Sequence, residues 1–284
     1  MSNIAFLGIG LLGSAFAEAA AKRGDTVTAW NRSPDKVRAL ASFGVKAAAS
    51  PAEAVRDATR VHLVLKDDAV VEQVLAVARA ALRPDAVIID HTTTLPALTA
   101  VRAQRLAADG LRYLHCPVFM GPPAARNAQG SMMIAGPRQL FDSVKTELAQ
   151  MTGRLEYLGE RADLAAANKL FGNAMILGVS AVMADVLTMA QATQVDPEDA
   201  IKVFKLIDLN MMLAGRGTNM AKGNFTPTFE LAMARKDVQL MLETAGDRPL
   251  AALPSLAARM DHLIAAGHGA QDCSVLGIDA VGRA

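Results

Sequence analysis

The sequence has little cysteine and no excess of either charge, and both absences exclude classes of protein. Cys116 and Cys273 are the two cysteines among 284 residues. They provide neither a disulfide framework nor a metal-binding spacing, so we expect a reducing compartment, the cytoplasm. Lysine and arginine number 29 against 28 aspartate and glutamate residues, and these charges are dispersed. Neither nucleic acid nor an anionic membrane is therefore an expected partner.

The sequence also lacks the spacing of a metal site, of a catalytic triad and of a membrane segment. Its five histidines, at 62, 91, 115, 262 and 268, follow no metal-ligand pattern, and no Ser/His/Asp triad is recognisable. The apolar N-terminal stretch has no basic region and contains three glycines, so we do not interpret it as a signal peptide. We expect that no apolar run reaches membrane-spanning length. The 52% apolar content instead predicts extensive burial in one or two domains.

A glycine-rich motif near the start is the most informative feature that is present. Gly8, Gly10 and Gly13 form G-x-G-x-x-G, with Leu11 and Leu12 between the last two glycines. An apolar strand (4–7) precedes the motif, an alanine-rich helix follows it, and a second strand (26–30) comes next. This order is typical of a dinucleotide-binding βαβ unit, in which glycines let the backbone approach a pyrophosphate.

The residues after the second strand predict which dinucleotide binds. NAD-binding units place an acidic residue there for the ribose 2′-hydroxyl, whereas this chain has Asn31, Arg32 and Ser33, followed by Lys36. A guanidinium and a hydroxyl can bind a 2′-phosphate, which a carboxylate would repel, so we predict NADP(H) rather than NAD(H). In a second interpretation, compatible with the first, Ser33 caps the next helix and Pro34 occupies its first turn.

Apolar strands alternate with helical stretches through the first half of the chain, which predicts a parallel, doubly wound α/β sheet of the Rossmann type. We assign residues 1–162 to this NADP-binding domain. Its ligand is expected outside the carboxyl ends of the strands, where loops 66–68, 91–94 and 119–123 lie. The predicted strands are 4–7, 26–30, 60–65, 86–90, 113–117 and 131–135.

The second half of the chain has a different character. Residues 163–193 are apolar and contain no proline, which predicts one long helix, buried as the core of a second domain. Residues 163–284 show no strand-like alternation and are assigned to an all-helical domain. Breaks between its helices are predicted at 196–197, 215–217, 226–227, 248–249 and 267–269.

Two polar pairs interrupt the apolar pattern of these helices. Lys169 and Asn173 stand four residues apart and share one helix face, from which they could present a cation and an amide to a carbonyl oxygen. Taken alone, such a pair is more often explained by a surface lysine near a helix start. Lys236 and Asp237 resemble a solvated helix face. His115, which follows a strand, is more simply a structural histidine.

Together these motifs resemble the β-hydroxyacid dehydrogenase family, which includes 3-hydroxyisobutyrate dehydrogenase, tartronate semialdehyde reductase and glyoxylate/succinic semialdehyde reductase. The resemblance runs nearly end to end. It is carried by the glycine motif with 30–33, by Asp90-His-Thr-Thr93, by Lys169-x-x-x-Asn173, by Lys236-Asp237 and by the tail 267–274.

The resemblance implies an oxidoreductase that moves a hydride between NADP(H) and a small carbonyl or alcohol, such as a semialdehyde, keto acid or 3-hydroxy acid. Lys169 would be the general acid or base, with a pKa lowered by burial, and Asn173 would hold the substrate or the lysine in line. The family's members form homodimers or homotetramers through the helical domain, so the resemblance implies substrate binding and dimerisation for residues 163–284. Further cofactor contacts are expected from Leu65, Lys66, Thr93 and Lys236.

One motif departs from the family pattern. The family has Ser-Gly-Gly in its substrate loop, whereas this chain has Phe119, Met120 and Gly121, which removes a hydroxyl and adds apolar bulk. Phe229, together with the methionines at 211 and 212, could extend this apolar lining. The loop favours a bulkier, less acidic aldehyde or ketone. It leaves two alternatives open, an imine reductase that uses NADPH and a cofactor-binding module without catalysis. Lys169 favours carbonyl chemistry, since imine reductases commonly lack that lysine.

Overall fold

The computed structural model describes residues 2–281, which form two compact units. Unit 1 comprises residues 1–173 and unit 2 comprises residues 174–284. The division falls inside helix α8 (Asp163–Ala192), which contributes its first part to unit 1 and the rest to unit 2. The predicted domain boundary, at 162/163, lies where this helix begins.

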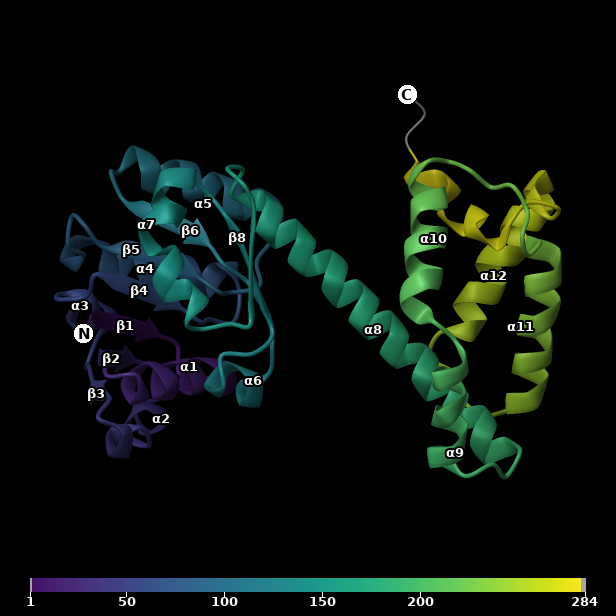
Figure 1. The fold of residues 1–284 in the computed structure, drawn as a ribbon, viewed down its shortest axis with the longest axis horizontal. Coiled ribbons are helices and arrows are strands. Elements are labelled where there is room, and N and C mark those ends of the chain that lie inside the picture. Colours follow the sequence, from purple (N-terminus) through teal and green to yellow (C-terminus); the bar gives the residue numbers. More distant parts are fainter. Residues whose placement is uncertain (1, 282–284) are drawn as a thin grey trace. The chain divides into compact units, whose positions relative to one another are not determined.

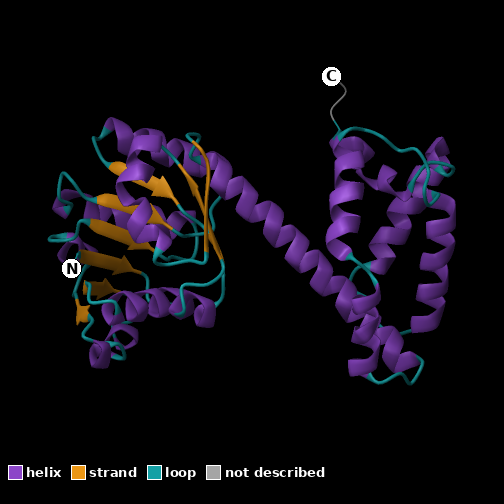
Figure 2. Cartoon of the chain, viewed as in Figure 1, coloured by secondary structure: helices purple, strands orange, loops and turns teal. Residues whose placement is uncertain are grey.

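Unit 1 is built on a nine-stranded sheet within the described residues (Figures 1 and 2). The strand order is β3-β2-β1-β4-β5-β6-β8-β7, and β9 pairs with β8. The pairs from β3 to β6 are parallel, whereas β6 and β7 both run antiparallel to β8. The strands are β1 (Asn3–Leu7), β2 (Thr26–Trp30), β3 (Lys46–Ala47), β4 (Arg60–Leu63), β5 (Val87–Asp90), β6 (Arg112–His115), β7 (Val118–Phe119), β8 (Ser131–Ala135) and β9 (Arg154–Gly159).

The predicted parallel, doubly wound sheet is confirmed from β3 to β6, and the edge around β8 adds antiparallel pairs. Strands β3, β7 and β9 were not among the predicted strands. Strands β3 and β7 have two residues each, too few to show a periodic pattern. Strand β9 has an alternating Arg-Leu-Glu-Tyr sequence that does signal a strand. The predicted strands 60–65 and 113–117 end earlier, at Leu63 and His115.

Both faces of the sheet are covered, so successive residues of a strand enter different cores. On β1, Ile4 and Phe6 join one apolar core, which α1 and α7 complete, whereas Ala5 and Leu7 join a second core with α3, α4 and α5. The helices of unit 1 are α1 (Leu11–Lys22), α2 (Asp35–Arg38), α3 (Pro51–Val55), α4 (Asp68–Ala78), α5 (Pro96–Ala108), α6 (Pro122–Arg126) and α7 (Arg138–Ala149).

Unit 2 is helical, with a core of its own formed mainly by α11, α12 and the C-terminal turns. Asp185 of α8 is 1% exposed, and its carboxylate accepts hydrogen bonds of 2.6–2.9 Å from the N–H groups of Ala251, Ala252 and Leu253. These bonds fasten the start of α12 to α8. The further helices are α9 (Pro197–Lys202), α10 (Leu209–Ala221), α11 (Leu231–Ala245) and α12 (Leu253–Leu263), labelled in Figure 1.

Two expectations for the helical half are wrong. Helix α8 was expected to be the buried core, yet most of its side chains after Lys169 are exposed, and Leu177 is 68% exposed. The physical reason is that α11 and α12 supply most of the apolar surface of that core. Helix α10 continues through Gly215 and Gly217, where a break was predicted, because single glycines weaken a helix without ending it. The other predicted breaks fall between helices or at their ends.

Helix α8 is also long and apolar enough to cross a membrane, judged by length and composition alone, and it is the one such helix among residues 2–281. The expectation that no segment reaches this length is wrong by that measure. Asp185 nevertheless lies within α8 and binds three main-chain N–H groups of the helical unit. The helix is thus an integral part of a folded unit with an apolar surface still exposed.

Candidate active site

The glycine motif forms the turn between β1 and α1. Gly8 has φ = +102°, and a Cβ there would lie 2.3 Å from the carbonyl oxygen of Val64. A Cβ on Gly13 would lie 2.0 Å from the carbonyl oxygen of Gly8, whereas no described atom comes within 4 Å of a Cβ on Gly10. The first and third glycines are therefore required by close packing, and the second faces open space.

The open side of this turn suits a dinucleotide pyrophosphate. Helix α1 begins at Leu11, directly after Gly10, and no side chain caps its N-terminus. Its first N–H groups, including those of Leu12 and Gly13, are the donors that a phosphate accepts from at a helix start. The Leu11 side chain is 82% exposed, while Leu12 packs against the core. The cradle thus fits the group that the sequence motif implies.

Asn31 fastens this turn to the end of β2. Its Oδ1 accepts a 2.9 Å hydrogen bond from the N–H of Ile9, and its Nδ2 donates a 3.0 Å bond to the carbonyl of Ser33. These two hydrogen bonds hold the glycine turn and the end of β2 together. Asn31, which was predicted to contact the cofactor, also lines the cleft beside this turn.

Arg32, Ser33 and Lys36 line a cleft of about 600 Å³ together with Gly8, Gly10, Leu65 and Lys66. None of the residues that line this cleft is acidic, while Arg32, Lys36 and Lys66 are cationic. Helix α2 begins at Asp35 after Pro34 and has no side-chain cap, so the prediction that Ser33 caps it is wrong. Ser33 is consequently not needed to start the helix.

One wall of the cleft is formed by residues that were not predicted from the sequence. Val70, Gln73, Val74 and Val77 of α4 line it. Their spacing of three and four residues places them on one face of the helix. That periodicity was visible in the sequence, but only the fold shows that this face of α4 lies beside the glycine turn.

The hydroxyl of Thr92 and the carboxylate of Asp90 connect the segments that follow β4 and β5. The N–H of Leu65 donates to Oγ1 of Thr92 (3.1 Å), and the N–H of Thr92 donates to Oδ1 of Asp90 (2.9 Å). Thr93, the predicted cofactor contact, is exposed just beyond β5. His115 is fully buried, with Nε2 near the carbonyl of Thr92 (3.0 Å), in agreement with its interpretation as structural.

Lys169 lies at the same edge of the sheet. Strands β6 and β7 are both antiparallel to β8, so the carboxyl end of β7 lies on the side of the glycine turn. There Nζ of Lys169 donates a 2.8 Å hydrogen bond to the carbonyl of Val118 and lies 4.2 Å from the centre of the Phe119 ring. Burial lowers the pKa of Lys169 below its ordinary value.

The predicted substrate loop offers few hydrogen-bond donors. Phe119 and Met120 are half-buried, and Gly121 is exposed before the first turn of α6. Pro122 and Pro123 occupy that turn and have no N–H group. Asn173, one helical turn after Lys169 and on the same face of α8, is half-buried.

The remaining candidates belong to unit 2. Lys236 is exposed on α11 and pairs with Asp237 at 2.9 Å. Phe229 is half-buried and packs against the helical core, so it stabilises that unit. Met211 and Met212 are exposed on α10, by 73% and 37%. The predicted site residues thus fall into two groups, one in each unit.

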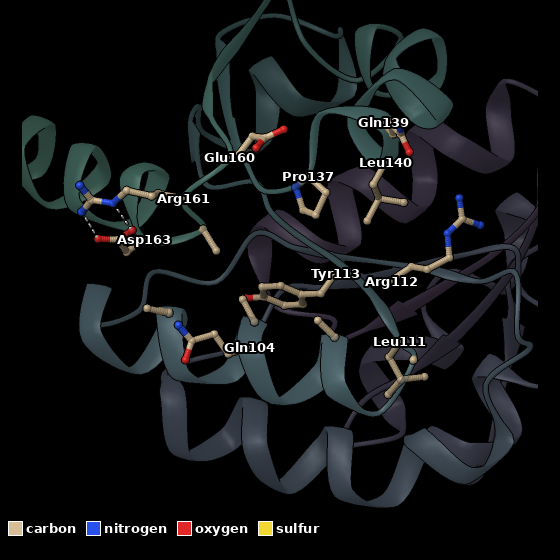
Figure 3. A pocket seen from close by; sticks show the side chains of 15 residues that line it. Gln104, Leu111, Arg112, Tyr113, Pro137, Gln139, Leu140, Glu160, Arg161 and Asp163 are labelled. Carbon is tan, nitrogen blue, oxygen red and sulfur yellow. Dashed lines mark hydrogen bonds and ion pairs between the residues drawn. The ribbon is translucent and has the colours of Figure 1, made fainter.

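A larger cavity, of about 950 Å³, contains none of the predicted site residues (Figure 3). It lies against α5, β6 and α7, beside the start of α8. Its arginines have partners, because Arg161 pairs with Asp163 at 2.7 Å and Arg112 donates to the carbonyl of Asp85 at 2.7 Å. Its size alone therefore does not identify it as the site.

Comparison with known proteins gives family matches for both halves of the chain. Residues 3–159 match the NAD binding domain of 6-phosphogluconate dehydrogenase, and residues 164–276 match the NAD-binding domain of NADP-dependent 3-hydroxyisobutyrate dehydrogenase. L-threonate dehydrogenase of Cupriavidus necator is 29% identical over 99% of both chains.

Two further similarities extend the comparison. The human cytokine-like nuclear factor N-PAC is 27% identical over 84% of this chain, which spans 44% of that protein. An imine reductase of Streptomyces aurantiacus has the same fold, with a TM-score of 0.89 and 24% identity, over 98% of this chain and 99% of that one.

Proposed function

The chain belongs to the β-hydroxyacid dehydrogenase family, and from this premise we propose that it is an NADP(H)-dependent oxidoreductase that reduces a small, uncharged carbonyl compound with Lys169 as general acid. The observation that carries the proposal is the half-buried ammonium of Lys169, bonded to the Val118 carbonyl at the carboxyl edge of a dinucleotide-binding sheet. A cationic donor in that place matches the oxygen of a carbonyl that gains negative charge as it is reduced.

The residues of this chain supply the proton and the geometry. When bound, the dinucleotide supplies a hydride from its nicotinamide ring. Lys169 carries three N–H donors, of which one is used by Val118, so the others can bind the substrate oxygen. Because burial lowers the pKa of Lys169, the ammonium gives up its proton more readily near neutral pH. Asn173, on the same helix face, offers an amide to the same oxygen.

We base the preference for NADP(H) on the charge of the cleft. A 2′-phosphate would find cationic Arg32 and Lys36 and no carboxylate among the lining residues. The match with an NADP-dependent family supports the same choice. Gly8, Gly10 and the start of α1 would hold the pyrophosphate.

The proposed substrate lacks a carboxylate because the loop beside Lys169 provides little to bind one. Phe119 has an apolar aromatic side chain, and Pro122 and Pro123 have no main-chain N–H group to donate to a carboxylate. Burying an unpaired carboxylate is costly. L-threonate dehydrogenase, one relative, is named for a carboxylated substrate, so this preference would distinguish the present chain. A function without catalysis is less favoured, since it gives Lys169 and Asn173 no role.

An NADPH-consumption assay with matched substrates tests the proposal. Butanal and succinic semialdehyde differ in a terminal carboxylate, as do benzaldehyde and 4-carboxybenzaldehyde. We expect kcat/KM to be at least about tenfold higher for the uncharged member of each pair. A preference for the carboxylated members would contradict the proposed substrate class. Turnover of a cyclic imine such as 2-methyl-1-pyrroline without turnover of any aldehyde or ketone would establish the imine alternative instead.

We further propose a homodimer or homotetramer in which the exposed apolar side chains of α8 and α10 meet a second copy of the chain. Leu177, Phe171 and Met211 are each more than 60% exposed, and an apolar surface of this kind marks a protein contact. The cytoplasm stays the proposed compartment, supported by Cys116 and Cys273, which are both buried and unpaired.

A further inference from the structure

We propose that Phe119 is a positioning residue, which holds the ammonium of Lys169 through the face of its ring, and that Gly172 provides the space for that ring. The inference rests on the proposed function of Lys169 as general acid. Phe119 would then influence proton transfer by Lys169 in addition to the choice of substrate.

The ammonium of Lys169 contacts the face of the Phe119 ring. Nζ of Lys169 lies 4.2 Å from the ring centre of Phe119 while it donates to the carbonyl of Val118, the preceding residue. A cation over an aromatic face is attracted to it, more strongly when it is partly desolvated. The two contacts come from adjacent residues of β7, so they fix the ammonium in one place.

The ring is held in place by close packing. A Cβ on Gly172 would lie 2.2 Å from Cζ of Phe119 and within 3.0 Å of both Cε atoms. The ring also packs with Met133, Ala165 and Leu164 in a small apolar cluster. Position 172 lies one turn after Lys169 on α8, so glycine there lets the helix approach the ring closely. Any larger residue would displace the ring that contacts the lysine.

The strands beside the ring carry no competing charge. Strands β7 and β8, which pack against the ring, contain no ionisable side chain. Asp163, at the start of α8, pairs with Arg161, and Glu156 of β9 pairs with Arg154. Burial lowers the pKa of Lys169. The face of the Phe119 ring and the Val118 carbonyl oppose this effect, because both favour the charged ammonium.

The test measures the Lys169 pKa by NMR in cofactor-free protein with ¹³C-labelled lysine, the signal being assigned by its loss in Lys169→Arg. Phe119→Leu keeps apolar bulk but removes the aromatic face. We expect the pKa to fall by about half a unit, roughly a threefold change in proton affinity. The alkaline limb of the kcat–pH profile should move down with it. Incorporation of 2,6-difluorophenylalanine at 119 weakens the ring face with little change of shape, so a smaller fall in the same direction is expected.

Substitutions at the glycine provide the control. Gly172→Ala should displace the ring and lower the Lys169 pKa in the same direction, yet have no further effect in a Phe119→Ser background, where no ring remains to be displaced. Gly178→Ala, on the same helix with no described atom within 4 Å of its Cβ, should leave the pKa unchanged.

Two results would overturn the inference. One is a Lys169 pKa that stays the same in Phe119→Leu and in the difluoro variant. The other is an effect of Gly172→Ala that persists in full in the Phe119→Ser background. If Phe119→Leu fails to fold, the difluoro and glycine variants still decide the question. Failure of the proposed function would look different, because Lys169→Ala would then keep its activity whatever the pKa measurements show.

Discussion

Single residues determine the chemistry on one edge of the sheet. Gly8 and Gly13 are required because a Cβ at either place would meet main-chain oxygen, and Gly10 leaves open the approach to the start of α1. Arg32 and Lys36 give the cleft its positive charge. These residues are local to one βαβ unit, so their spacing in the sequence was sufficient to predict them.

The preference for NADPH is expected to depend on Arg32. Arg32→Glu removes a hydrogen-bond donor and places a negative charge where the 2′-phosphate would bind, so NADPH affinity should fall by about tenfold to a hundredfold. NADH affinity should change little. Equilibrium binding measured by the fluorescence of the reduced nicotinamide provides both dissociation constants.

Arg38→Glu is the matched control, since Arg38 lies on α2, pairs with Asp35 and does not line the cleft. Equal losses of NADPH and NADH in Arg32→Glu, or a wild-type preference for NADH, would show that the 2′-phosphate argument is wrong.

Other residues of the site could not be predicted from the sequence. The Phe119 ring reaches Gly172 across more than fifty positions of the chain, and no local pattern indicates such a contact. Asn31, a predicted cofactor contact, lines the cleft, and its amide also joins the N–H of Ile9 to the carbonyl of Ser33, which its sequence position did not indicate. In both cases the role of the side chain depends on contacts with residues distant in the sequence, which only the fold brings close.

At the scale of elements, two adjacent strands place a pair of histidines side by side. His62 lies in β4, and His91 directly follows β5. Nδ1 of His91 lies 2.7 Å from the carbonyl of Cys116, which can only accept, so Nδ1 carries the proton. Nε2 of His91 is then the acceptor for Nδ1 of His62, at 2.9 Å. Burial lowers the pKa of His91 to about 4 and that of His62 well below its ordinary value. Both rings are consequently neutral in the folded protein.

This pair predicts a loss of stability in mild acid. The unfolded histidines take up protons below about pH 6.5, whereas folded His91 does so only at about pH 4 and the pKa of folded His62 also lies well below its ordinary value, so the unfolded state gains protons as the pH falls below about 6.5. The free energy of unfolding should decrease by about 1.4 kcal/mol per pH unit for each histidine. Urea unfolding at pH 7.0, 6.0 and 5.0 measures this slope.

The double variant His62→Gln, His91→Gln should have a flatter slope whatever its stability at pH 7, because it keeps only His115 of the three buried histidines whose pKa is lowered. His262→Gln, at an exposed position, should retain the wild-type slope. A wild-type slope in the double variant would assign the acid sensitivity to other groups.

The elements themselves were predictable where they are long or follow a periodic pattern. Strand β2 and strand β8 have the predicted bounds, and α8 ends one residue before its prediction. Strand β7, with two residues, and the antiparallel edge around β8 were not predictable. The direction in which these strands pair depends on how the chain turns after His115. Such a turn has no periodic sequence pattern from which the direction could be predicted.

At the scale of the whole molecule, α8 raises the question of what covers its apolar side chains. The sequence predicted α8 as the buried core of the helical half, whereas that core forms mainly from α11 and α12. A second copy of the chain, as proposed, would bury the side chains that a single chain leaves exposed.

Light scattering coupled to size-exclusion chromatography should therefore give a mass of at least two chains at micromolar concentration. Leu177→Glu places a charge on the exposed surface of α8, where Leu177 is 68% exposed, and should shift the protein towards a single chain. Val101→Glu is the control, because Val101 is 60% exposed on α5 and outside the proposed contact. A wild-type protein that runs as a single chain would contradict the proposed assembly.

The most direct test of the account concerns Lys169, the residue that joins the cofactor edge to the proposed chemistry. Lys169→Ala should lower kcat for the best carbonyl substrate by about a hundredfold to ten-thousandfold, since a positioned acid contributes that much. NADPH affinity should stay within about twofold, because Lys169 does not line the dinucleotide cleft. A Lys169→Ala enzyme that binds NADPH and keeps kcat within about threefold of wild type would contradict the assignment of Lys169 as the general acid.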